Sequence, residues 1–82
     1  MNLYKGYRDT VSRIGETEMI TKTHIFYTEP RYGWCELHLD ADDYQIGEAF
    51  YHYRKADAIK SAKRMNVPAH IFGKNGLFQR TA

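Results

Sequence analysis

The chain is 82 residues long, carries a formal net charge of +2, and is 43% hydrophobic and 27% charged. This composition argues against disorder, and the length predicts one domain near the lower limit for folding without a disulfide or a metal. The single cysteine, Cys35, excludes an internal disulfide framework and a cysteine-based zinc finger. No apolar run reaches transmembrane length and the N-terminus has no signal-peptide core, so we expect a cytoplasmic protein that does not bind a membrane.

The small net charge hides an uneven distribution along the chain. Residues 32–53 contain five acids and no lysine or arginine, whereas residues 54–82 contain seven lysines and arginines against one acid, Asp57. This asymmetry predicts two oppositely charged patches on the folded protein.

Residues 1–17 show no sustained hydrophobic period, and we expect an irregular N-terminal arm there, with a candidate short strand near Tyr4 to Tyr7, followed by a single domain over 18–82. Residues 19–29 are rich in β-branched and aromatic side chains, which predicts a strand. Residues 30–33 contain a proline and a glycine and predict a turn. The alternation over 34–40 predicts a second strand. Its faces are Cys35, Leu37 and Leu39 on one side, and Trp34, Glu36 and His38 on the other.

Residues 44–53 are ambiguous, because their apolar positions fit both a strand and a helix. We favour a strand, since Gly47 and the aromatic residues suit a sheet and the acidic stretch 41–43 suits a hairpin loop. The alternative is one helix from Tyr44 to Met65, and the sequence leaves it open.

Residues 54–66 have the clearest helical period. The apolar arc of this helix is Ala58, Ile59, Ala62 and Met65, and the opposite side carries Lys60, Lys63 and Arg64. Asn66 and Pro68 are suited to end it, because asparagine accepts a left-handed conformation and proline cannot continue a helix.

The last third of the chain completes the predicted fold. Residues 69–72 predict a short strand, 73–76 a tight turn, and 77–80 a candidate final strand. The fold class is therefore α+β: a small antiparallel sheet in the order β-β-β-α-β, with one helix packed on one face.

About the last fifty residues resemble a group of small bacterial and phage proteins of uncharacterised function. The shared pattern is a tryptophan-initiated hairpin, a helix with lysine and alanines at fixed spacing, a short strand and a Gly-Lys-Asp/Asn-Gly turn. Here these are Trp34, then Lys55, Ala58, Ile59 and Ala62, then HIFGKNG at 70–76. The chain departs from the pattern at the helix cap, where Tyr53 replaces the usual threonine or serine.

A second, weaker resemblance is to the C-terminal half of double-stranded-RNA-binding domains, in which a strand meander leads into a lysine-rich helix. The matching stretch is RKADA at 54–58, where Ala58 replaces the last lysine of that signature. The helix that begins such domains is not matched by residues 1–17.

The predicted helix opens with two cations, Arg54 and Lys55, at the end where the helix dipole disfavours them. Such a surface is either a solvated helix face, a contact for an acidic protein, or a phosphate-binding patch. The aromatic side chains cannot all point inward from a single-layer sheet, so several are expected on the surface. They are Phe26, Tyr27, Tyr32, Trp34, Phe50, Tyr51 and Tyr53.

Chemistry at a catalytic or metal centre is not expected. The histidines fall on one predicted strand each and form no His-x-His or His-x-x-x-His pair, so we expect neither a metal site nor a cofactor. They are His24, His38, His52 and His70. Cys35 lies between strand hydrophobics on the side predicted to point inward, which indicates an inert buried thiol. We therefore expect no enzyme activity.

The sequence favours a non-catalytic binding protein. The resemblance implies a phage or mobile-element protein that acts by docking on a host protein or complex and inhibiting or modulating it. The alternative is a nucleic-acid-binding module that uses the helix 54–66 and sheet aromatics, and a homodimer is a further candidate assembly. The candidate partner-binding residues are Arg54, Lys55, Lys60, Lys63, Arg64, Trp34, Tyr32, Asp42 and Asp43.

Overall fold

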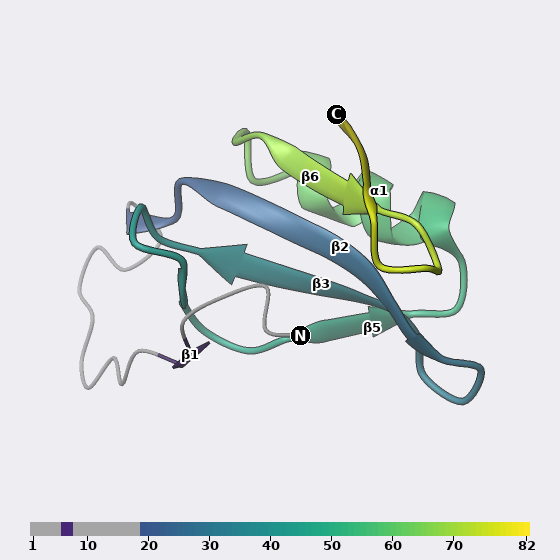
Figure 1. Cartoon of the computed structure of the whole chain (residues 1–82). Coiled ribbons are helices and arrows are strands. Elements are labelled where there is room, and N and C mark those ends of the chain that lie inside the picture. The colour runs from purple at the N-terminus through teal and green to yellow at the C-terminus, as the bar shows by residue number, and fades with distance from the viewer. Residues whose placement is uncertain (1–5, 8–18) are drawn as a thin grey trace.

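The computed structural model describes residues 6–7 and 19–82 (Figure 1). Most of the predicted arm 1–17 lies outside these residues. The elements are β1 (Gly6–Tyr7), β2 (Lys22–Glu29), β3 (Gly33–Leu39), β4 (Tyr44–Gln45), β5 (Phe50–His52), α1 (Lys55–Lys63), β6 (Ala69–Phe72) and β7 (Phe78–Thr81). The α+β class is as predicted. From β2 onwards the order of elements follows the prediction, except that the third predicted strand is divided into β4 and β5.

The described strands form one sheet in the order β1-β4-β3-β2-β6-β7, and β5 also pairs with β3. The sheet is mixed, because β2 pairs with β6 in parallel and β1 pairs with β4 in parallel. The prediction of an entirely antiparallel sheet is therefore wrong. The reason is that α1 carries the chain from β5 across β3 and β2 to the far side of β2. A helical crossover of this kind makes the next strand, β6, run parallel to the strand before the helix.

Residues 44–53 form strand rather than helix, as we favoured. The strand is interrupted between β4 and β5, where Gly47 has a φ of 75°. Glycine accepts this left-handed conformation without strain, so the interruption allows both short strands to pair with β3.

The helix α1 is shorter than the predicted range 54–66. The N-cap residue is Arg54, one residue after the predicted position at Tyr53, and it provides no side-chain cap. Asn66 adopts the predicted left-handed conformation, with a φ of 60°. Ala58 and Ala62 are fully buried against the sheet, which confirms the predicted apolar arc.

The helix covers the face of β3 that carries Trp34. Under it lies a cluster formed by Ile25, Trp34, Ala58, Ala62, Ala69 and Ile71. The other face of β3 forms a second cluster, Cys35, Leu37 and Leu39, with Phe26 and Ala49 packed against it. Both faces of β3 are therefore buried, as are all seven of its residues.

Cys35 is buried as predicted, although on the face away from the helix. Burial, reinforced by the negative charge of Glu36, raises the pKa of the thiol to about 11. A thiol of this kind stays protonated near neutral pH and is a poor nucleophile. Among the described residues, no helix is both long and apolar enough to cross a membrane.

Candidate binding surface at one end of the sheet

A pocket of about 240 Å³ opens at the end of the sheet where β2 turns into β3. Four side chains line it, Arg31, Tyr32, Tyr51 and Tyr53, which we call the tyrosine pocket. The three tyrosines are 48%, 55% and 81% exposed in that order. Aromatic side chains are usually more buried than this, so their gathering at one place marks a candidate contact surface.

Strand register brings these residues together. Trp34 pairs with His52 and Cys35 pairs with Tyr51, so Tyr53 follows directly beyond β5 and lies beside Gly33. A Cβ atom at Gly33 would overlap the carbonyl oxygen of His52, and Gly33 also has a φ of 75°. Only glycine fits this position, and it allows the end of β5 to approach the β2–β3 turn.

Contacts within the pocket pair a cation with aromatic rings. The Tyr32 and Tyr51 ring centroids are 5.7 Å apart with a tilt of 47°. The Arg31 guanidinium carbon lies 5.6 Å from the Tyr32 ring centroid, within the range of a cation–π interaction. Among the described residues, the pocket lining is thus aromatic and cationic, with no acidic and no aliphatic side chain.

Further cations lie at the same end of the sheet, and two of them, Lys55 and Lys74, are on the face that α1 covers. Arg54 follows Tyr53 and is exposed. Lys55 Nζ lies 5.1 Å from the Trp34 ring centroid and donates to Gln79 Oε1, and Lys74 Nζ lies 4.8 Å from the Tyr27 ring centroid. We call the pocket together with Arg54, Lys55 and Lys74 the tyrosine end.

The structure separates the candidate residues chosen from the sequence. Tyr32, Arg54 and Lys55 lie at the tyrosine end, whereas the exposed Lys60, Lys63 and Arg64 lie further along α1. Asp42 and Asp43 lie beyond the opposite end of β3, where Asp43 forms an ion pair with Lys22.

Trp34 has to be removed from the candidate contact residues. It is only 7% exposed, packs in the cluster under α1, and meets Tyr27 edge-on at a centroid distance of 5.3 Å. Its place in the core follows from the parity of β3, because the helix covers the Trp34 face. Sequence reasoning also missed Arg31, whose only signal was its position in the turn next to Tyr32.

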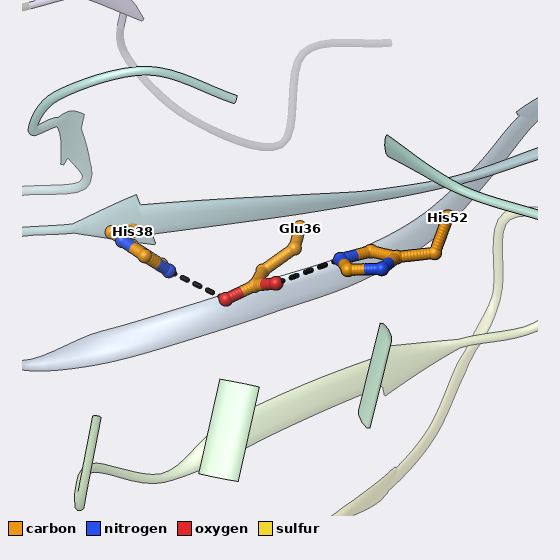
Figure 2. A network of polar contacts seen from close by, with 3 residues as sticks. All are labelled: Glu36, His38 and His52. Carbon is orange, nitrogen blue, oxygen red and sulfur yellow. Dashed lines mark hydrogen bonds and ion pairs between the residues drawn. The ribbon is translucent and has the colours of Figure 1, made fainter. Parts of the chain in front are cut away.

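A buried polar network lies on the face of the sheet that α1 covers, and Figure 2 shows three of its residues. Glu36 is 1% exposed and accepts hydrogen bonds from His38 Nε2 at 2.6 Å and from His52 Nε2 at 3.0 Å. Ser61 from α1 donates a third hydrogen bond to the same carboxylate. We call these four residues the Glu36 network, and it ties β3, β5 and α1 to one another.

The Glu36 carboxylate is held in its ionised form. Burial alone would raise its pKa, but the hydrogen bonds from His38, Ser61 and His52, with the charge of His38, outweigh burial and lower the pKa below its ordinary value. The two imidazoles approach from opposite sides and each uses Nε2 on a different oxygen (Figure 2). Within the described part of the chain, no group of histidine, cysteine and acidic side chains has a geometry that could hold a metal ion.

A second pair of histidines lies on the face away from the helix. His24 on β2 stacks on His70 of the neighbouring β6 with a centroid distance of 5.3 Å, and Phe72 contacts the same ring. His24 is 7% exposed, and its Nδ1 atom has no hydrogen-bond partner among the described residues. Burial, with the charges of His70 and Lys22, lowers the pKa of His24 to about 4, although Asp43 acts in the opposite direction.

Acidification is therefore expected to destabilise the protein before its carboxylates titrate. The unfolded chain binds a proton at His24 near the ordinary pKa of 6.5, whereas the folded chain resists protonation until about pH 4. The free energy of unfolding should fall by up to about 3 kcal/mol between these values. Denaturant unfolding measured at several pH values in this range gives the slope of the free energy of unfolding against pH. Replacement of His24 by phenylalanine should flatten this slope. An unchanged slope in that variant would assign the effect to other groups.

Comparison with known proteins finds no matching family model, no similar curated protein and no similar solved structure. The function is therefore argued from the geometry of the tyrosine end.

Proposed function

We propose that the chain is a non-catalytic binding protein that contacts an anionic partner through its tyrosine end. The observation that carries this proposal is the pocket of three exposed tyrosines and an arginine, with further cations at the same end of the sheet. Tyrosine and arginine are the residues that most often dominate the binding energy of interfaces. The Glu36 carboxylate at the centre of the network is buried, which supports a role in holding the fold rather than in chemistry on a substrate.

The sign of the partner's charge follows from where the charges lie. The tyrosine end carries Arg31, Arg54, Lys55 and Lys74 against two acids, Glu29 and Asp57, and so has a net positive charge. The acidic loop lies at the opposite end of β3. The resemblance to small phage proteins suggests a host protein or complex as the partner, and an acidic surface on such a protein would fit the tyrosine end.

Two double variants with the same change in net charge test the proposal. Arg31→Ser with Arg54→Ser removes two cations from the tyrosine end, and Lys60→Ser with Lys63→Ser removes two from the helix. We expect the first to weaken binding of fluorescently labelled poly-L-glutamate by roughly 5- to 30-fold, since two exposed ion pairs contribute about 0.5–1 kcal/mol each. The second should change affinity by about twofold or less. Equal losses in both variants would show diffuse charge attraction and contradict the proposal.

A further inference from the structure

The lining of the tyrosine pocket matches a nucleobase better than a protein side chain. Three tyrosine rings and a guanidinium line it, and the part of the chain that the structure describes adds none of the aliphatic side chains that shape most pockets for apolar anchors. Its volume of about 240 Å³ lies below the range of about 300–1,000 Å³ of pockets for drug-sized ligands, so it suits one planar group. Aromatic rings stack on any base, because every base has a π-face.

We infer that the tyrosine end binds single-stranded nucleic acid, with one base in the tyrosine pocket and the neighbouring phosphates on Arg31 and Arg54. This inference rests on the proposed function and names the chemistry of its partner. It differs from a helix-based interface, because Lys60, Lys63 and Arg64 are not required. A duplex would not supply the base, since its bases remain stacked on one another and the pocket needs one that is splayed out.

Phosphate binding at this end is not opposed by the acidic loop. β3 has seven residues, which span roughly 20 Å, and it separates Asp40 at one end from Gly33 at the other. Charges in solution are screened over about 8–10 Å at physiological ionic strength. The acidic loop is therefore too distant to weaken the binding of phosphates at the tyrosine end.

The test compares three labelled probes by fluorescence anisotropy: a short oligothymidylate, the matching duplex and poly-L-glutamate. We expect the intact protein to bind the single strand at least about tenfold more tightly than the duplex or poly-L-glutamate, because stacking of one base is worth roughly 10- to 100-fold. Affinity should fall with salt with a logarithmic slope of about −1.4, as expected when about two phosphates are neutralised by Arg31 and Arg54.

Variants of the tyrosines separate stacking from charge. Tyr53→Ala should reduce the affinity for the single strand by roughly 10-fold or more, and Tyr53→Phe should retain it, because phenylalanine still stacks. Tyr53 is 81% exposed, so its replacement leaves the core intact. The matched control is Phe78→Ala, which removes a 56% exposed aromatic side chain from β7. It should leave the affinity unchanged.

The outcomes distinguish this inference from the function on which it rests. One outcome is that the single strand binds no more tightly than poly-L-glutamate, with an affinity that Tyr53→Ala does not change. That result would overturn the inference and leave the proposed function standing. A partner protein whose binding requires Tyr53, together with no binding of oligothymidylate, would also overturn it. Absence of binding to all three probes would overturn the inference and the anionic partner together.

Discussion

Replacement of Glu36 by alanine is expected to lower the free energy of unfolding by about 3–5 kcal/mol, a large part of the stability of a domain this small. Glu36 is fully enclosed and accepts hydrogen bonds from β3, β5 and α1 at once. Its removal leaves two imidazoles and the Ser61 hydroxyl without their acceptor, and an unpaired buried polar group costs more than its hydrogen bond contributed.

Denaturant unfolding near neutral pH measures this loss. Glu48→Ala is the matched control, because it removes an exposed acid from the stretch between β4 and β5 and should change stability by about 0.5 kcal/mol or less. A loss below about 1 kcal/mol for Glu36→Ala would show that the network does not hold the three elements together.

The contribution of Glu36 should depend on pH in a defined direction. The folded protein lowers the pKa of this carboxyl, so the unfolded chain binds a proton first as the pH falls. The stabilisation is therefore fully present above the ordinary pKa of 4.5 and is lost as the pH falls through the lower, folded value. The difference in stability between the intact protein and Glu36→Ala should shrink in strong acid.

Replacement of Trp34 by alanine is expected to cost about 3–5 kcal/mol, as is usual for a large aromatic side chain in a core. Trp34 packs among Ile25, Ala58 and Ala62, and its ring also meets Tyr27 and Lys55. The alanines of α1 are too small to fill the space that the indole would leave, so a cavity would remain between helix and sheet.

Thermal or denaturant unfolding checks this value, and Tyr53→Ala is the matched control. Tyr53 is exposed and lies at the same end of the sheet, so its loss should change stability by about 0.5 kcal/mol or less. If Trp34→Ala instead preserved stability and abolished binding, Trp34 would be a contact residue, as the sequence first indicated, and its assignment to the core would be wrong.

Local patterns explain why much of the fold could be predicted. The strand periods of residues 22–29 and 33–39, the helix near 55–63 and the turn at 73–76 follow from spacing and from turn residues alone. Asn66 has the conformation that its position before Pro68 indicates. These signals act over a few residues and do not depend on how distant segments meet.

The face on which the helix packs could not be predicted in the same way. Glu36 and His38 share a face of β3 with Trp34. Because two of these three side chains are polar, the pattern indicates a face exposed to solvent rather than one in the core. The face is buried because His52 and Ser61, which lie 16 and 25 residues after Glu36, arrive on β5 and α1 to satisfy the carboxylate. Long-range partners of this kind leave no periodic signal in the sequence.

The tyrosine pocket is also a product of tertiary register. Its residues come from a turn and from the end of a strand about twenty residues later, and they meet because Gly33 allows β5 to approach. The sequence indicated that some aromatics must be exposed, and it could not show which of them would gather. Its candidate set combined residues from both ends of the sheet with one from the core.

The central claim is that the tyrosine end, and not the exposed side of α1, is the contact surface. An NMR titration of isotope-labelled protein with the oligothymidylate tests it most directly, because amide shifts map the contact residue by residue. We predict that the largest shifts fall at residues 31–33 and 51–55. Shifts concentrated at residues 60–64, with the tyrosine end unchanged, would contradict the claim.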